Sequence, residues 1–171
     1  SAPVADELPE ADQSTLDNFV DHVVGVDGQP VVVSREIYDA GVTELTGDEL
    51  KAIYKKEITN WSEVGGPDRE IQAIGRAEGS GTDTAFRANL YGNPDATVDP
   101  DVRKGQNQQV KTLVSNTDNA IAYIALAFVE PDGAVPPIAL ELDGTTYEYG
   151  KNLGAKGYPL SRDLHCYTWE D

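Results

Sequence analysis

The segment 71–90 constrains the fold of this chain more than any other part of its sequence. An apolar run at its start predicts a β-strand and its second half predicts a helix, so Gly79, Ser80 and Gly81 lie at a strand-to-helix turn. Glycines at such a turn let the backbone approach a ligand closely, and serine is a favoured N-cap residue. The first amides of a helix lack internal acceptors and its dipole favours negative charge, so the turn is suited to bind an anion.

Three further side chains surround this turn. Arg76 carries a planar, permanently charged guanidinium that suits phosphate or carboxylate, and Thr82 adds a hydroxyl. Glu78 is unexpected, because it places a carboxylate inside a turn that otherwise suits an anion. No lysine follows the last glycine, so the turn is not a P-loop. The residues alone fit an anion cradle and an ordinary capped helix with a surface ion pair equally well.

The charge balance restricts the partners of the chain. It has 171 residues, enough for one domain with a core, and 30 acids against 13 bases give a net charge of −17. Such a surface disfavours nucleic acid and anionic membranes and is typical of halophilic proteins, an acidic mesophilic protein being the alternative. No stretch reaches the ~18 apolar residues of a membrane span. Because neither a methionine nor a signal peptide begins the chain, we expect it to be a segment of a longer protein.

The cysteine, tryptophan, histidine and aspartate residues of the chain form no pattern of a catalytic or metal site, so we expect structural roles for them. Cys166 is the only cysteine, which excludes an intrachain disulfide, and we expect it to be a small buried residue in a strand. Trp61 and Trp169 are expected to be packing anchors. His22 and His165 lie far apart in the sequence with no pattern of acid and nucleophile around them. The scattered aspartates lack the spacing of a calcium loop, so we expect no metal and no cofactor.

The remaining sequence alternates between helical and strand patterns. Thr46 and Glu49 form a capping box before a helix with an apolar stripe, and Asp143-Gly144 predicts a hairpin turn. The expected helices are 14–23, 46–57, 84–90 and 108–114, with a further helix beginning at 125, and the expected strands are 23–26, 31–33, 71–74, 120–124, 138–142, 145–149 and 158–169. The runs 23–26 and 31–33 predict either a hairpin or one strand with a bulge. This alternation predicts an α/β fold with a mixed sheet.

Four motifs, in this order, resemble the phosphate-binding protein of phosphate ABC importers. They are Leu45-Thr46 to Ile53 followed by Ile58-Thr59-Asn60-Trp61; Ile74-Gly75-Arg76 with Gly79-Ser80-Gly81-Thr82; Ala120-Ile121-Ala122-Tyr123-Ile124; and Tyr158-Pro159-Leu160-Ser161-Arg162. The resemblance implies a periplasmic-binding-protein-like α/β lobe, with a mixed central sheet flanked by helices and crossover strands at both ends. Residues 1–22 would be a lead-in from the first lobe and 23–171 the second lobe, the first lobe being missing. The outgoing crossover would be 24–33 and the returning one 160–169.

The resemblance also implies the phosphate ligands. Arg76, Ser80, Gly81 and Thr82 match the family's ligands in this lobe, and Glu78 matches an aspartate that pins the arginine. Glutamate is one methylene longer, which leaves its reach to Arg76 open. A carboxylate can also favour phosphate over sulfate, because phosphate keeps a proton that the carboxylate accepts. The chain departs from the family pattern at two further positions, Lys56 and Ala122, where glycine is usual.

The function implied is extracytoplasmic capture of inorganic phosphate for delivery to the membrane permease of an ABC importer, without catalysis. The protein would lie outside the cell or in an equivalent of the periplasm, anchored through a missing N-terminal segment. An oxyanion sensor or interaction domain is one alternative. An enzyme with Ser80 as nucleophile is another, but the sequence around Ser80 supplies no histidine as base.

Overall fold

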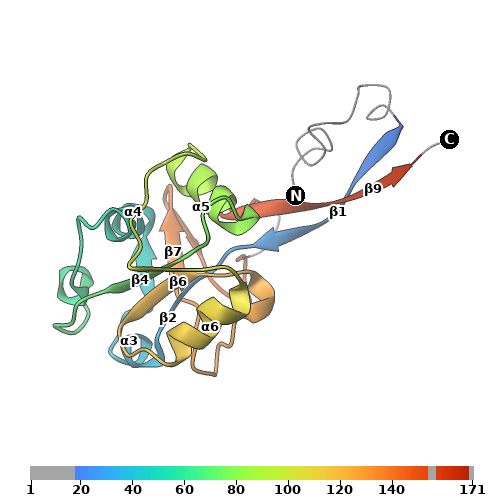
Figure 1. The fold of residues 1–171 in the computed structure, drawn as a ribbon. Helices are drawn as coiled ribbons and strands as arrows, with labels where there is room; N and C mark the ends of the chain where they lie inside the picture. The colour runs from blue at the N-terminus through green and yellow to red at the C-terminus, as the bar shows by residue number, and fades with distance from the viewer. Residues whose placement is uncertain (1–17, 154–156, 170–171) are drawn as a thin grey trace.

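The computed structural model describes residues 18–153 and 157–169, which form a lobe from which a two-stranded ribbon projects (Figure 1). In chain order its elements are β1 (Phe19–Gly28), β2 (Val31–Val33), α3 (Arg35–Asp39), β3 (Glu44–Thr46), α4 (Gly47–Tyr54), η1 (Trp61–Val64), β4 (Gln72–Arg76), α5 (Gly81–Tyr91), β5 (Val102–Lys104), α6 (Asn107–Ser115), β6 (Ala120–Tyr123), η2 (Leu126–Phe128), β7 (Ala139–Leu142), β8 (Thr145–Tyr147) and β9 (Ser161–Trp169). The fold is α/β with mixed sheets, as predicted.

The central sheet has the strand order β2-β6-β4-β5, with β2 antiparallel to β6 and the other pairs parallel. Helices cover both of its faces (Figure 1). Ile121 and Tyr123 of β6 pack with the apolar stripes of α4 and α5, whereas Ala120 and Ala122 pack with α6. This alternation follows from the two-residue period of a strand, and it explains why the strand is apolar throughout.

The second sheet, β3-β7-β8, pairs β3 parallel to β7 and β7 antiparallel to β8. Its hairpin turns at Asp143 and Gly144, whose φ angles of 51° and 78° are both left-handed. Two left-handed central residues are what a two-residue type I′ hairpin requires, and Asp-Gly supplies them. The hairpin predicted from Asp143-Gly144 is confirmed.

The ribbon consists of β1 and β9, which pair antiparallel from Phe19 opposite Trp169 to Gly28 opposite Ser161. The predicted helix 14–23 is therefore wrong where the structure describes it, because Phe19 begins a strand; residues 14–17 lie outside the described part. Pairing with a strand that is distant in sequence overrides the local helix signal. The predicted hairpin or bulged strand across 23–33 is also wrong, since β1 and β2 belong to different sheets.

Most local signals predicted the right element. The capping box of Thr46 and Glu49 is present, as are the Ser80 cap and a left-handed Gly92 at the end of α5. Four elements were not predicted, namely α3, β3, η1 and β5, and the helix expected at 125 is only the single 3₁₀ turn η2.

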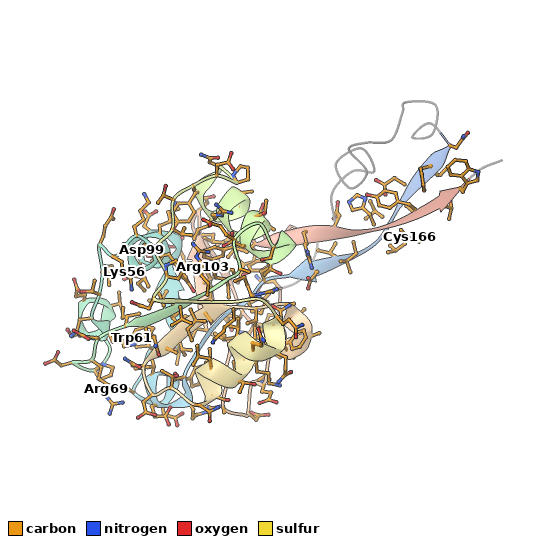
Figure 2. The ribbon with its side chains drawn as sticks, viewed as in Figure 1. Lys56, Trp61, Arg69, Asp99, Arg103 and Cys166 are labelled. Carbon is orange, nitrogen blue, oxygen red and sulfur yellow. The ribbon has the colours of Figure 1, made fainter. Side chains whose placement is uncertain are left out.

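Two predictions for single residues have opposite outcomes. Trp61 is fully buried and its indole Nε1 donates to the Asn119 carbonyl at 3.0 Å, which confirms a packing anchor. Cys166 was predicted to be buried, but it lies exposed on the ribbon (Figure 2), because a two-stranded ribbon leaves side chains open to solvent. None of the helices in the described ranges has the length and hydropathy to cross a membrane.

Candidate anion-binding site

The turn between β4 and α5 has the local geometry expected from its sequence. Gly79 adopts a left-handed φ of 73°, which glycine tolerates, and Ser80 caps α5 with φ −67° and ψ 144°. The Ser80 Oγ accepts a hydrogen bond from the Asp83 amide at 3.3 Å. The amides of Gly81 and Thr82 are the first two of the helix and have no acceptor within it.

Arg76 ends β4 and is buried, with 7% of its surface exposed. Its Nη1 donates to the Thr82 hydroxyl at 3.0 Å and to Oδ1 of Asn107 at 2.6 Å. Its Nη2 donates to the Gly105 carbonyl at 2.8 Å and its Nε to the Lys104 carbonyl at 3.4 Å. All four acceptors are neutral oxygens.

The charge of Arg76 is therefore not neutralised by direct contact. Within 18–153 and 157–169, no carboxylate forms an ion pair with Arg76. Burial lowers the pKa of Arg76 and the positive charge of Arg162 lowers it further, while the nearby Asp83 carboxylate acts in the opposite direction without touching the guanidinium. An arginine still holds its proton at neutral pH, so the site keeps a buried positive charge beside a helix N-terminus. Such a charge favours an anion.

A buried carboxylate, Asp83, organises the base of the turn. It is fully buried, its Oδ1 accepts from the Tyr123 hydroxyl at 2.9 Å and lies 3.2 Å from Nη1 of Arg103, and its Oδ2 lies 2.6 Å from Nη2 of Arg87. Arg103 also donates from Nη1 to the Arg76 carbonyl at 3.1 Å. Asp83 thus connects α5 to the two strands on either side of the site.

Sequence reasoning missed Asp83 and the residues that clamp Arg76. An acid in the first turn with an arginine four residues later is a recognisable helix signal, so the pair Asp83 and Arg87 could have been predicted from the sequence. Asn107 and Gly105 were not, because both follow β5, which lies in a segment that was predicted to be a loop. Their contacts with Arg76 depend on the parallel pairing of β5 with β4.

The structure brings four of the five predicted site residues together and leaves one apart. Arg76, Ser80, Gly81 and Thr82 share one turn, in which Thr82 is buried and Gly81 is exposed. Glu78 is exposed, and no hydrogen bond or ion pair joins it to Arg76. The part played by Glu78 stays a prediction.

The sequence and fold of this chain are similar to those of known proteins. A profile described as a PBP superfamily domain matches residues 1–171. The chain belongs to the PBP superfamily. This PBP-superfamily chain is 34% identical over 150 residues to the phosphate-binding protein PstS of Bacillus subtilis, covering 88% of the chain and 47% of that relative. It is 25% identical to PstS of Staphylococcus haemolyticus over 175 residues, covering 99% of the chain and 54% of the relative.

Solved structures agree with the fold of this PBP-superfamily chain. A Clostridium perfringens structure with bound phosphate, described as a phosphate ABC transporter substrate-binding protein, has a TM-score of 0.71 at 30% identity, covering 89% of this chain and 59% of that one. A phosphate transport receptor of Vibrio cholerae has a TM-score of 0.69 at 29% identity, covering 95% and 63%. The chain spans about half the length of the curated relatives it matches, from 47% to 54%.

Proposed function

We propose that this chain binds inorganic phosphate outside the cytoplasm, as one wall of an interlobe site, for delivery to the membrane permease of an ABC importer. The observation that carries the proposal is the buried guanidinium of Arg76, whose four acceptors are all neutral. A buried charge without a counter-ion is costly. A bound phosphate supplies the missing negative charge and removes that cost.

The other predicted ligands complete the wall. Arg76 gives charge-assisted hydrogen bonds to phosphate oxygens, and the Ser80 hydroxyl with the amides of Gly81 and Thr82 meets the remaining oxygens of that face. Thr82 also holds the guanidinium, since its hydroxyl accepts from Nη1 of Arg76 at 3.0 Å. None of these groups is needed as a nucleophile, so the proposed function is binding without turnover.

The proposal includes a second lobe. Residues 1–22 would lead in from that lobe and 23–171 would form the lobe described here. The ribbon supports this division, because β1 enters and β9 leaves the lobe side by side (Figure 1). Paired strands of this kind suit the two crossovers that join the lobes of a solute-binding protein. Such a protein would be held at the cell surface by a segment before Ser1.

Calorimetric titration of the full-length gene product with phosphate and with sulfate tests the proposal. We expect phosphate to bind more tightly, and Arg76→Ala to abolish binding while Arg69→Ala, at an exposed arginine far from the turn, leaves it intact (Figure 2). The same titration on residues 1–171 alone should give weak binding, because the opposite wall is absent. Tighter sulfate binding would favour a general oxyanion sensor instead. Absence of heat with either anion contradicts the proposal.

A further inference from the structure

The lobe end of the ribbon rests against the anion-binding turn. The Asn89 Nδ2 of α5 donates to the Ser161 carbonyl at the start of β9 at 2.8 Å. The Nε2 of Gln29, a fully buried residue that follows β1, donates to the Thr82 carbonyl at 3.2 Å. The start of β9 and the residue after β1 therefore both hold α5 through polar contacts.

Arg162, the second residue of β9, brings another guanidinium to this turn. A Cβ built on Gly81 would lie only 2.8 Å from Nη1 of Arg162, so the amino group occupies the space that a side chain at position 81 would need. The absence of a side chain at Gly81 thus leaves room for this end of Arg162 beside the backbone of the turn. Arg162 thereby places a second permanent charge at the first residue of α5.

The guanidinium of Arg162 is held on one side and open on the other. Its Nε and Nη2 both donate to a single oxygen, Oδ2 of Asp27, at 3.2 and 3.1 Å. The side chains of Arg162 and Asp27 are 29% and 16% exposed. Among the described residues, Nη1 donates to no acceptor. A purely structural pair gains most by matching two nitrogens to two oxygens, whereas this arrangement leaves Nη1 directed at Gly81.

The charge of Arg162 also acts on Arg76, the arginine already proposed as a ligand. The positive charge of Arg162 lowers the pKa of Arg76, so the two guanidiniums act on each other across the turn. Like charges held in a half-buried site repel unless an anion lies between them. Asp27 already pairs with Arg162, whereas Arg76 has no carboxylate in direct contact within the described part of the chain, so a phosphate at the turn supplies negative charge near both guanidiniums.

We propose that Arg162 is a second phosphate-binding arginine, which donates from Nη1 to the anion that Arg76 holds while Asp27 fixes its other edge. This inference rests on the proposed function and adds a ligand from the ribbon. Because Arg162 belongs to β9, its contact joins phosphate occupancy to the strand that leaves the lobe. The ribbon would then respond directly to the ligand.

Arg162→Gln, Arg162→Lys and Asp27→Asn in the full-length protein test the inference, with Arg69→Gln as the matched loss of an exposed positive charge. We expect Arg162→Gln to weaken phosphate binding at least about tenfold relative to Arg69→Gln, and Arg162→Lys to fall between them, since lysine keeps the charge and loses the fork. The salt dependence of the phosphate Kd should also decrease in Arg162→Gln.

The outcomes separate the inference from the proposed function. Asp27→Asn removes the ion pair and keeps the guanidinium, so it should retain clearly more affinity than Arg162→Gln. Equal losses in Asp27→Asn and Arg162→Gln would assign Arg162 a structural role and overturn the inference. If Arg162→Gln binds phosphate as tightly as Arg69→Gln does, the inference is overturned as well. The proposed function still stands in that case, provided that the wild-type protein binds phosphate. If the wild-type protein binds no phosphate, both the inference and the proposed function are overturned.

Discussion

The hydroxyl of Tyr123 donates to Oδ1 of Asp83 at 2.9 Å and accepts from the backbone amide of Arg76 at 3.2 Å. One buried oxygen thus joins β6, α5 and the end of β4. The ring of Phe86 stacks on Tyr123 with centroids 3.7 Å apart, which fixes the direction of the hydroxyl. The backbone of Arg76 is therefore positioned by a tyrosine of the central strand.

Tyr123→Phe removes both of these hydrogen bonds and keeps the packing of the ring. We expect the free energy of unfolding to fall by about 1–3 kcal/mol, because the Arg76 amide loses its acceptor in a buried position. Urea denaturation measures this loss, and Tyr149→Phe is the control because Tyr149 is 45% exposed. Equal stability of the two variants would show that the buried hydroxyl contributes nothing.

Asp83→Asn should destabilise the lobe more than Tyr123→Phe. Asp83 is fully buried and forms ion pairs with Arg87 at 2.6 Å and Arg103 at 3.2 Å. Removing the carboxylate leaves two largely buried cations without their partner, which costs about 3 kcal/mol. The measurement is again urea denaturation, with Asp99→Asn at an exposed position of the same lobe as control (Figure 2). A loss no larger than that of the control would contradict the prediction.

Buried tyrosines set the alkaline limit of stability. Burial is the main cause that raises the pKa of Tyr54, Tyr123 and Tyr158 above the ordinary value of 10.0. Below pH 10 these tyrosines are protonated in both states and their contribution to stability is constant; above it they lose protons in the unfolded chain that they keep in the folded one. The free energy of unfolding should therefore fall above about pH 10, by up to about 1.4 kcal/mol per pH unit for each tyrosine.

Removing one of these tyrosines checks the cause. Tyr158 is 2% exposed and its hydroxyl donates to the Gln29 carbonyl at 3.1 Å. Above pH 10, Tyr158→Phe should reduce the slope of the free energy of unfolding against pH by the contribution of one tyrosine. This holds whatever the variant does to stability at neutral pH. Urea denaturation across a pH series measures both quantities. An unchanged slope would mean that Tyr158 ionises equally easily in both states.

Local sequence signals predicted the turn of the site but not its surroundings. The cap at Ser80 and the left-handed Gly79 depend on neighbours within four residues, so the pattern of the turn contains them. The clamp on Arg76 by Asn107 depends on β5 lying beside β4, and β5 has one apolar residue followed by Arg103 and Lys104, so it lacks the apolar run that made 31–33 recognisable. Phe19 was misassigned to a helix because its strand partner, Trp169, lies at the other end of the chain.

Lys56 is strained, and a pair of variants measures the strain. Its φ of 62° is left-handed, which costs a non-glycine residue about 1–2 kcal/mol. Its Nζ forms an ion pair with Asp101 at 2.6 Å, and the side chains are 27% and 37% exposed. Lys56→Gly and Lys56→Ala both lose that pair, but only glycine relieves the strain, so the glycine variant should be more stable by about 1 kcal/mol. Equal urea midpoints would refute this.

Two roles are predicted for Glu78, accepting the phosphate proton or orienting Arg76. They differ in their effect on anion selectivity, so a substitution of Glu78 distinguishes them. Glu78 is exposed and makes no hydrogen bond to Arg76 in the described structure, so its carboxylate is open to an anion bound at the turn. A carboxylate accepts the proton that phosphate keeps near neutral pH and repels sulfate, which has none. Glu78→Gln should therefore strengthen sulfate binding relative to phosphate, whereas the exposed Glu70→Gln should leave the ratio unchanged. If Glu78 only orients Arg76, Glu78→Gln weakens both anions by the same factor, and calorimetric titration with each anion separates the two roles.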